Sequence, residues 1–216
     1  MDRPAELVWK VGRVTIQPVT KTMTRLKTYG RDRIPRSGGI VLAINHFAWV
    51  DTVSFGATCP RTVYFVAKAE AYDVPGLAQL IRAFGAFPIR RGESDREAVR
   101  LMRQFVREGR VLGVFVEGTR QRSGIPGKAM PGAAMVALQE DVPVVPAAIH
   151  GSQMWRIGNF HPVSVAVGEP VRFDGLPRGS RGYREATVEI ERRIRRLWEF
   201  LVDVHRLGRP DGTPPQ

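Results

Sequence analysis

A histidine and an aspartate stand five residues apart in the segment Asn45–Asp51, directly after the apolar run Ile40–Ile44. Five residues correspond to about 140° around a regular helix, so the two side chains would not share a helical face. They can meet if His46 lies in the turn before a helix and Asp51 in its first turn. A carboxylate that fixes the tautomer of an imidazole leaves the second ring nitrogen free to remove a proton. This segment is therefore compatible with a general-base pair formed by His46 and Asp51.

The nucleophile that such a base would activate is not evident in the chain. No Gly-x-Ser-x-Gly nucleophile elbow occurs anywhere in the sequence. A base without an enzyme nucleophile fits a direct transfer to a substrate hydroxyl, or hydrolysis by water. The spacing alone also allows a structural reading, in which His46 only caps the helix and Asp51 interacts with its N-terminus.

Three further segments could form the rest of a site. Glu117–Arg120 follows the apolar run Val111–Val116, and Gly118 permits a tight turn whose backbone N–H groups, with Thr119 and Arg120, could face an anion. As a motif it is also compatible with an ordinary surface turn. The other two segments are Gly85–Gly92, which contains Arg90 and Arg91, and Val142–Pro146.

The elements that would position these residues alternate between strands and helices. Strands are expected at Leu26–Tyr29, Ile40–Ile44, Val63–Ala67, Ala86–Ile89, Val111–Val116, Val142–Ile149, Val163–Val167 and Val171–Phe173. Helices are expected at Ala48–Ala57, Pro75–Phe84, from a Ser94–Glu97 capping box to Gly109, at Ala133–Glu140 and at Tyr183–Arg206.

This alternation predicts a single α/β domain with a largely parallel, partly mixed sheet flanked by helices. The domain would span residues 25–207, including an amphipathic C-terminal helix over 183–206. A basic, partly amphipathic segment, residues 1–24, would precede it. A loose Pro/Gly tail, residues 208–216, would follow it.

The four segments together resemble the conserved blocks of the glycerolipid acyltransferase family, over roughly Leu26 to Pro170. The resemblance places the family's His-x-x-x-x-Asp signature on His46 and Asp51, and its Glu-Gly-Thr-Arg block on Glu117–Arg120. Its Phe-Pro-x-x-Arg block corresponds to Phe87–Arg91, and its Val-Pro-x-x-Pro block to Val142–Pro146.

The resemblance implies the family fold and an O-acyltransferase with His46 as general base and Asp51 as its partner. The residues it implies for the acceptor's phosphate are Arg91, Glu117, Gly118, Thr119 and Arg120. Asn45 and Lys128 would support the site, Lys128 standing in for a lysine that family members often carry where this chain has Met130. Other departures, Val116, Phe47 and Ala48, bear on the acceptor headgroup more than on the reaction.

The implied donor is acyl-CoA or acyl carrier protein, a co-substrate rather than a bound cofactor. The implied acceptor is a lysophospholipid, first of all 1-acylglycerol-3-phosphate; another lysophospholipid or a glycolipid is the alternative. Because a thiolate is a good leaving group, we expect no metal, and Cys59, the single cysteine, allows neither an internal disulfide nor a thiolate cluster.

The formal net charge of +12 implies an anionic partner, and the excess of Lys and Arg is greatest toward the two ends of the chain. Charge alone does not distinguish membrane lipid, a phosphorylated substrate, an acidic carrier and nucleic acid. With no apolar stretch long enough to span a bilayer and no signal peptide, we expect a cytoplasmic protein, peripheral on the inner face of the cell membrane. A basic nucleic-acid-binding or lipid-binding module without catalysis is the rival class. The absence of interleaved stacking aromatics and of familiar motifs argues against nucleic acid.

Overall fold

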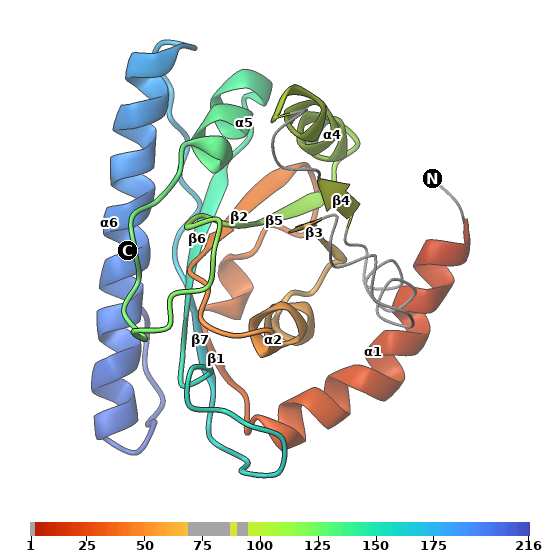
Figure 1. The fold of residues 1–216 in the computed structure, drawn as a ribbon, viewed down its shortest axis with the longest axis vertical. Coiled ribbons are helices and arrows are strands. Elements are labelled where there is room, and N and C mark those ends of the chain that lie inside the picture. Colours follow the sequence, from red (N-terminus) through yellow and green to blue (C-terminus); the bar gives the residue numbers. More distant parts are fainter. Residues whose placement is uncertain (1–2, 69–86, 90–94) are drawn as a thin grey trace.

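A seven-stranded sheet forms the centre of the molecule, in the order β1-β7-β6-β2-β5-β3-β4. The structure is a computed structural model, and it describes residues 3–68, 87–89 and 95–216 (Figure 1). The strands are β1 (Lys27–Tyr29), β2 (Ile40–Ile44), β3 (Val63–Lys68), β4 (Phe87–Ile89), β5 (Val111–Phe115), β6 (Val144–His150) and β7 (Ser164–Val167). All neighbouring strands are parallel except β6 and β7, so the predicted α/β fold with a largely parallel, partly mixed sheet is confirmed.

Helices cover both faces of this sheet. They are α1 (Arg3–Met23), α2 (Val50–Thr58), α4 (Asp95–Arg107), α5 (Gly132–Glu140) and α6 (Ser180–Arg206), with a short 3-10 turn, η1 (Arg31–Arg33). Leu42 and Ile44 of β2 pack with Phe55 of α2, whereas Val41 and Ala43 pack with α4, α5 and α6. Because successive strand residues point to opposite faces, β2 is buried on both and reads as one continuous apolar run.

The sheet is tightly packed where β5 lies between β2 and β3. A Cβ atom on Gly113 would come within 2.6 Å of the Phe65 ring, so only glycine leaves room for that ring. On the other face, the apolar stripe of α6 packs against β6 and β7, and α5 lies beside it (Figure 1).

Among the described helices, none combines the length and the apolar character that crossing a bilayer requires.

Several expected elements differ in extent. The helix expected at Pro75–Phe84 lies outside the described residues, as does Ser94 of the capping box. The described part of α4 ends at Arg107, and Gly109 follows it with a left-handed φ of 73°. Val171–Phe173 is not a strand, because Val171 makes only an isolated bridge to Val144.

The N-terminal segment forms a helix that contacts α2. Gln17 of α1 donates from Nε2 to the carbonyl oxygen of Gly56, near the C-terminal end of α2, over 2.9 Å. In Figure 1, α1 runs along one side of the sheet and ends close to the connection between β6 and β7. Part of this basic segment is therefore held against the domain.

The tail at residues 208–216 is held in place, so the prediction of a loose tail is wrong. Lys27 pairs with Asp211 over 2.8 Å, and Pro214 is buried. Side chains of Lys27, Tyr29 and Arg33 donate to tail carbonyl oxygens, namely those of Arg209, Pro210, Pro214 and Pro215. The composition misleads here because proline and glycine keep their backbone carbonyls as acceptors, and β1 and η1 supply the donors.

Arg33 donates to the carbonyl oxygens of Pro214 and Pro215 at the end of this tail, and we expect Arg33→Ala to release that end. Arg33 is also paired with Glu169 at 2.7 Å and donates to the carbonyl oxygen of Val167. Loss of these charge-assisted bonds should lower the free energy of unfolding by about 1–3 kcal/mol and make the tail accessible to a carboxypeptidase. Arg36→Ala, an exposed arginine three residues away, is the control. Equal denaturant midpoints for the two variants would contradict this role.

Candidate active site

The site lies where β2 and β5 end side by side. These strands are parallel neighbours, and their last residues, Ile44 and Phe115, are in register. The N–H of Val116 donates to the carbonyl oxygen of Ile44 over 2.9 Å, which extends the pairing by one step. The residues that follow, His46 and Glu117, therefore leave the sheet at the same point, at the carboxyl ends of parallel strands where α/β proteins place their ligands.

His46 and Asp51 meet in the one geometry that their spacing allows. His46 lies in the turn before α2 and Asp51 in the first turn, and Nδ1 of His46 is 2.8 Å from Oδ2 of Asp51. The same Oδ2 accepts the backbone N–H groups of Phe47 at 2.6 Å and of Ala48 at 2.8 Å. Asp51 is fully buried. One carboxylate oxygen thus shapes the turn and orients the imidazole.

The orientation of the His46 ring leaves Nε2 available. An ionised Asp51 can only accept, so Nδ1 carries the proton in this bond and Nε2 holds a lone pair. Within the described residues, nothing hydrogen-bonds to Nε2. The ring stacks on Phe115 with centroids 3.9 Å apart, and the side chain is 17% exposed. The arrangement suits a base that takes a proton from a group arriving at the surface.

Glu117 organises the backbone around the histidine. Its Oε2 accepts the N–H of His46 and its Oε1 accepts the N–H of Gly127, each over 2.7 Å. These two bonds tie the β2–α2 turn to the connection between β5 and α5. Glu117 is buried and faces the protein, as expected for a residue that positions the loops rather than one that contacts an anion directly.

The burial of Glu117 has an electrostatic consequence. Desolvation raises its pKa to about 7, and the nearby carboxylates of Asp51 and Glu191 act in the same direction. The two accepted N–H bonds act in the opposite direction, but desolvation is the larger effect. Glu117 therefore changes its charge near neutral pH, and a single hydrogen bond joins it to the backbone of His46.

The residues after Glu117 bring polar groups to the surface beside His46. Gly118 adopts a left-handed φ of 66°, which turns the chain, and Thr119 and Arg120 are exposed. The N–H of Gln121 then donates to the carbonyl oxygen of His46 over 2.7 Å. The turn predicted to face an anion thus runs directly alongside the histidine.

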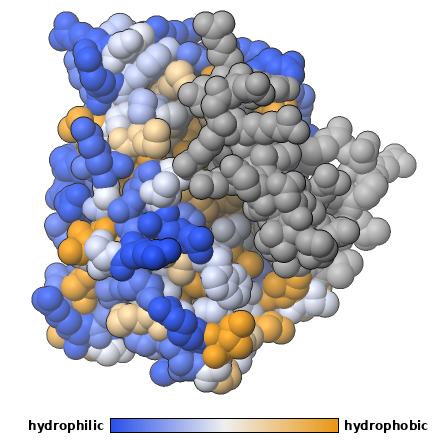
Figure 2. All heavy atoms as spheres, in the orientation of Figure 1, coloured by the Kyte–Doolittle hydropathy of each residue, from blue (hydrophilic) through white to orange (hydrophobic). Residues whose placement is uncertain are grey.

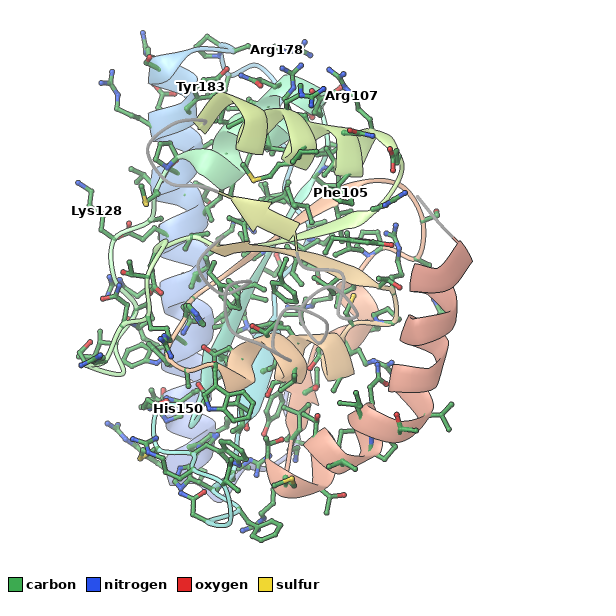
Figure 3. The ribbon with its side chains drawn as sticks, turned by 45° about the vertical axis from the view of Figure 1, so that its right-hand side comes forward. Phe105, Arg107, Lys128, His150, Arg178 and Tyr183 are labelled. Carbon is green, nitrogen blue, oxygen red and sulfur yellow. The ribbon has the colours of Figure 1, made fainter. Side chains whose placement is uncertain are left out.

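The remaining predicted site residues are placed differently. Asn45 is fully buried and exchanges two hydrogen bonds with the backbone of Ile149, at 2.9 and 3.1 Å, so it fastens the end of β2 to β6. Lys128 is exposed and points away from the molecule (Figure 3), so the structure does not bring it to His46. Arg91 lies outside the described residues.

Three contacts of the site were absent from the sequence analysis: the stacking of Phe115, and the backbone donors of Gln121 and Gly127. Phe115 could be inferred only once β2 and β5 are known to be neighbours in register. Backbone donors carry no side-chain signature, although the glycines and prolines of residues 124–131 indicate an irregular connection.

Two other histidines lie close together at the end of β6. The rings of His150 and His205 are in edge-to-face contact, with centroids 4.7 Å apart. Burial lowers the pKa of His150 to about 4 and that of His205 to about 3, so both are neutral at pH 7. In the part of the chain that the structure describes, no group of three His, Cys, Asp or Glu side chains could hold a metal ion.

Fold and site together define an α/β protein with a histidine–aspartate pair beside a turn rich in hydrogen-bond donors. The family model described as "Acyltransferase" matches residues 25–150, more than half of the chain and all the described elements of the site. The chain therefore belongs to the acyltransferase family.

Known proteins are similar to this chain over stretches of different length. The 1-acyl-sn-glycerol-3-phosphate acyltransferase of Bacillus subtilis is 27% identical over 180 residues, which cover 80% of this chain and 87% of that protein. A lyso-ornithine lipid O-acyltransferase of Rhodobacter capsulatus is 40% identical over 82 residues, 38% of this chain and 29% of that protein. The fold matches the crystal structure of the 1-acyl-sn-glycerophosphate acyltransferase PlsC of Thermotoga maritima, with a TM-score of 0.73 and 23% identity, over 94% of this chain and 84% of that one.

The raised pKa of Glu117 predicts a pH-dependent contribution to stability. Because the folded state binds this proton more tightly than the unfolded state, the contribution is full below about pH 4.5 and is lost as the pH rises through 7. From pH 5 to 8, the free energy of unfolding of the wild type should fall relative to that of Glu117→Gln by up to about 3 kcal/mol. His150 and His205 change stability with pH in the opposite direction, because burial lowers their pKa values. Both proteins contain them, so their effect cancels in the difference between the two free energies of unfolding. A difference that does not change with pH would contradict the shifted pKa.

Proposed function

We propose that this chain transfers a fatty-acyl group from a thioester to the free hydroxyl of a phosphate-bearing lysolipid, with His46 as general base. The observation that carries this proposal is the 2.8 Å contact between Nδ1 of His46 and Oδ2 of Asp51, which leaves Nε2 unpaired within the described residues. Membership of the acyltransferase family supplies the reaction class.

The reaction can be written on these atoms. Nε2 of His46 accepts the proton of the acceptor hydroxyl while its oxygen attacks the thioester carbonyl carbon. The resulting imidazolium is stabilised by the carboxylate of Asp51. When the tetrahedral intermediate collapses, the C–S bond breaks, and the thiolate takes the proton back from Nε2. The reactants enter and the products leave without a covalent enzyme intermediate, which agrees with a sequence that has no Gly-x-Ser-x-Gly nucleophile elbow.

The acceptor's phosphate would bind beside this base. We assign it to the turn that carries Gly118, Thr119 and Arg120, because this turn is exposed and runs alongside His46. Arg91 is proposed on the resemblance alone. Glu117 would act through the backbone by holding the two loops, and Asn45 would hold the end of β2.

The acceptor that we favour is 1-acylglycerol-3-phosphate. The Bacillus subtilis relative carries this name, and its similarity extends over most of both chains. The Rhodobacter capsulatus relative, named for a lyso-ornithine lipid, is similar over a shorter stretch and makes another lysolipid the second candidate. Acyl-CoA and acyl carrier protein are both compatible donors, because the proposed chemistry requires only the thioester. The lipid acceptor would be reached at the surface of a membrane.

The substitution His46→Ala tests the proposal. We expect a folded protein whose acyl transfer to 1-acylglycerol-3-phosphate falls by about a hundredfold or more, the range for a lost general base. The product is measured by mass, with one labelled acyl donor and a panel of lysolipid acceptors.

A matched control is available in α2. Ser54 is buried one turn after Asp51, and among the residues that the structure describes its hydroxyl has no hydrogen-bond partner, so Ser54→Ala should leave the rate unchanged. Near-normal transfer by the His46→Ala variant would remove the pair from the mechanism. Release of free fatty acid without acceptor, at a rate equal to transfer, would instead identify a hydrolase.

A further inference from the structure

Within the connection between β6 and β7, the loop of residues 151–162 presents large apolar side chains to solvent. Met154 is 47% exposed, Ile157 77% and Phe160 49%. We call these three residues the apolar tip. In Figure 2, apolar and hydrophilic residues lie side by side along the lower edge of the molecule, where Figure 1 shows this connection and the end of α1. A cluster of exposed apolar side chains on one loop indicates a surface that binds a partner.

The apolar tip is held outward by a hydrogen-bonded loop. Oδ1 of Asn159 accepts the N–H groups of Arg156 and His161, each over 3.0 Å, and Nδ2 of Asn159 donates to the carbonyl oxygen of Met154. Phe160 itself has a φ of 47°, a conformation that is rare for a bulky residue. The loop is therefore built in one shape, and this shape exposes the tip rather than burying it.

This loop borders the candidate active site. Trp155 is buried at its base and donates from Nε1 to the carbonyl oxygen of Met23, at the end of α1. The Trp155 ring also contacts the ring of Trp49, three residues after His46, with centroids 5.4 Å apart. On its other side, the loop touches the connection that follows Glu117, because a Cβ atom on Gly124 would lie 3.1 Å from Gln153.

The surroundings of the apolar tip are positively charged. The segments that meet here contain no acidic residue over long stretches, namely residues 7–31, 33–50, 118–139 and 142–168. Exposed cations lie on the same segments, including Lys21, Arg25 and Arg156. A hollow of about 510 Å³ adjoins the end of the loop, and Arg25, Lys27 and Arg209 are among the residues that line it.

We propose that the 151–162 loop inserts its apolar tip into an anionic bilayer, so that the candidate site opens toward the membrane that holds its lipid substrate. The pairing of exposed apolar side chains with surrounding cations fits the interface of a membrane with negatively charged headgroups. The choice of a membrane as the partner rests on the proposed function. The exposure of the apolar tip and the cations around it do not depend on that function. The loop would then act beside the basic helix α1 and fix the orientation of the domain on the membrane.

The test compares vesicle binding of the full chain with that of a triple variant, Met154→Gln, Ile157→Gln and Phe160→Asn. Asparagine tolerates the positive φ at position 160, so the loop should keep its shape. In co-sedimentation with vesicles of phosphatidylcholine and phosphatidylglycerol, we expect the lipid concentration for half-maximal binding to rise about tenfold or more, as expected for lost apolar burial. Val188→Gln, a residue of α6 that is 68% exposed, is the matched control and should change nothing.

Two further measurements separate the contributions. Lys21→Gln should weaken binding to the anionic vesicles at low salt and leave binding to phosphatidylcholine vesicles unchanged. Transfer to a short-chain acceptor below its critical micelle concentration, without vesicles, should be the same in the triple variant and the wild type. If the wild type transfers no acyl group but the triple variant loses vesicle binding, the proposed function fails and the membrane surface stands.

Several results would overturn the inference. Equal binding of wild type and triple variant to anionic vesicles would show that the tip stays out of the bilayer. Complete displacement from vesicles by soluble glycerol phosphate would identify a site for a free anion instead. A wild type that sediments as a dimer without lipid, with a monomeric triple variant, would assign the tip to an interface between copies of the chain.

Discussion

The arrangement of the site depends on one oxygen atom, Oδ2 of Asp51. It accepts three N–H groups, from the His46 ring and from the backbone of Phe47 and Ala48, and it does so fully buried. A buried carboxylate is tolerated only where such donors replace water. The same three bonds fold the turn between β2 and α2 and fix the direction of the imidazole. The shape of the turn and the tautomer of the histidine are therefore consequences of a single interaction.

A second buried carboxylate, Glu117, connects this turn to the neighbouring strand. Through the N–H groups of His46 and Gly127 it joins two connections that are far apart in the sequence but adjacent at the ends of β2 and β5. Its raised pKa leaves it partly protonated near pH 7, which limits the repulsion between two carboxylates that share a small buried volume. The loop at residues 151–162 adds an outer layer, because it packs on Trp49 and on the connection after Glu117. The candidate base His46, the turn at Gly118–Arg120 and the apolar tip therefore lie at one end of the sheet.

The sequence predicted the parts of this arrangement that depend on local pattern. Apolar runs marked β2 and β5 because both are buried on two faces, and the five-residue spacing of His46 and Asp51 required the turn-then-helix geometry that the structure has. It could not predict contacts that depend on register, such as Phe115 against His46, or backbone donors such as Gln121. Composition suggested a loose tail, yet the donors that hold residues 208–216 come from β1 and η1, far away along the chain. Lys128, which the resemblance implied as a substitute for a lysine at the position of Met130, is exposed and points away from the molecule (Figure 3), and the direction of an exposed side chain cannot be inferred from a motif.

The tautomer of His46 is the most direct measure of this account. In ¹⁵N-histidine-labelled protein, the nitrogen chemical shifts of neutral His46 should show a protonated Nδ1 and an unprotonated Nε2, with a strongly downfield Nδ1–H resonance from its bond to Asp51. In the Asp51→Asn variant, the amide oxygen can take the place of Oδ2 and accept the same three N–H groups, so the turn should be retained. Because that oxygen carries no negative charge, the downfield Nδ1–H resonance should be lost. A neutral His46 protonated at Nε2, or one whose two nitrogens exchange freely, would contradict the central claim.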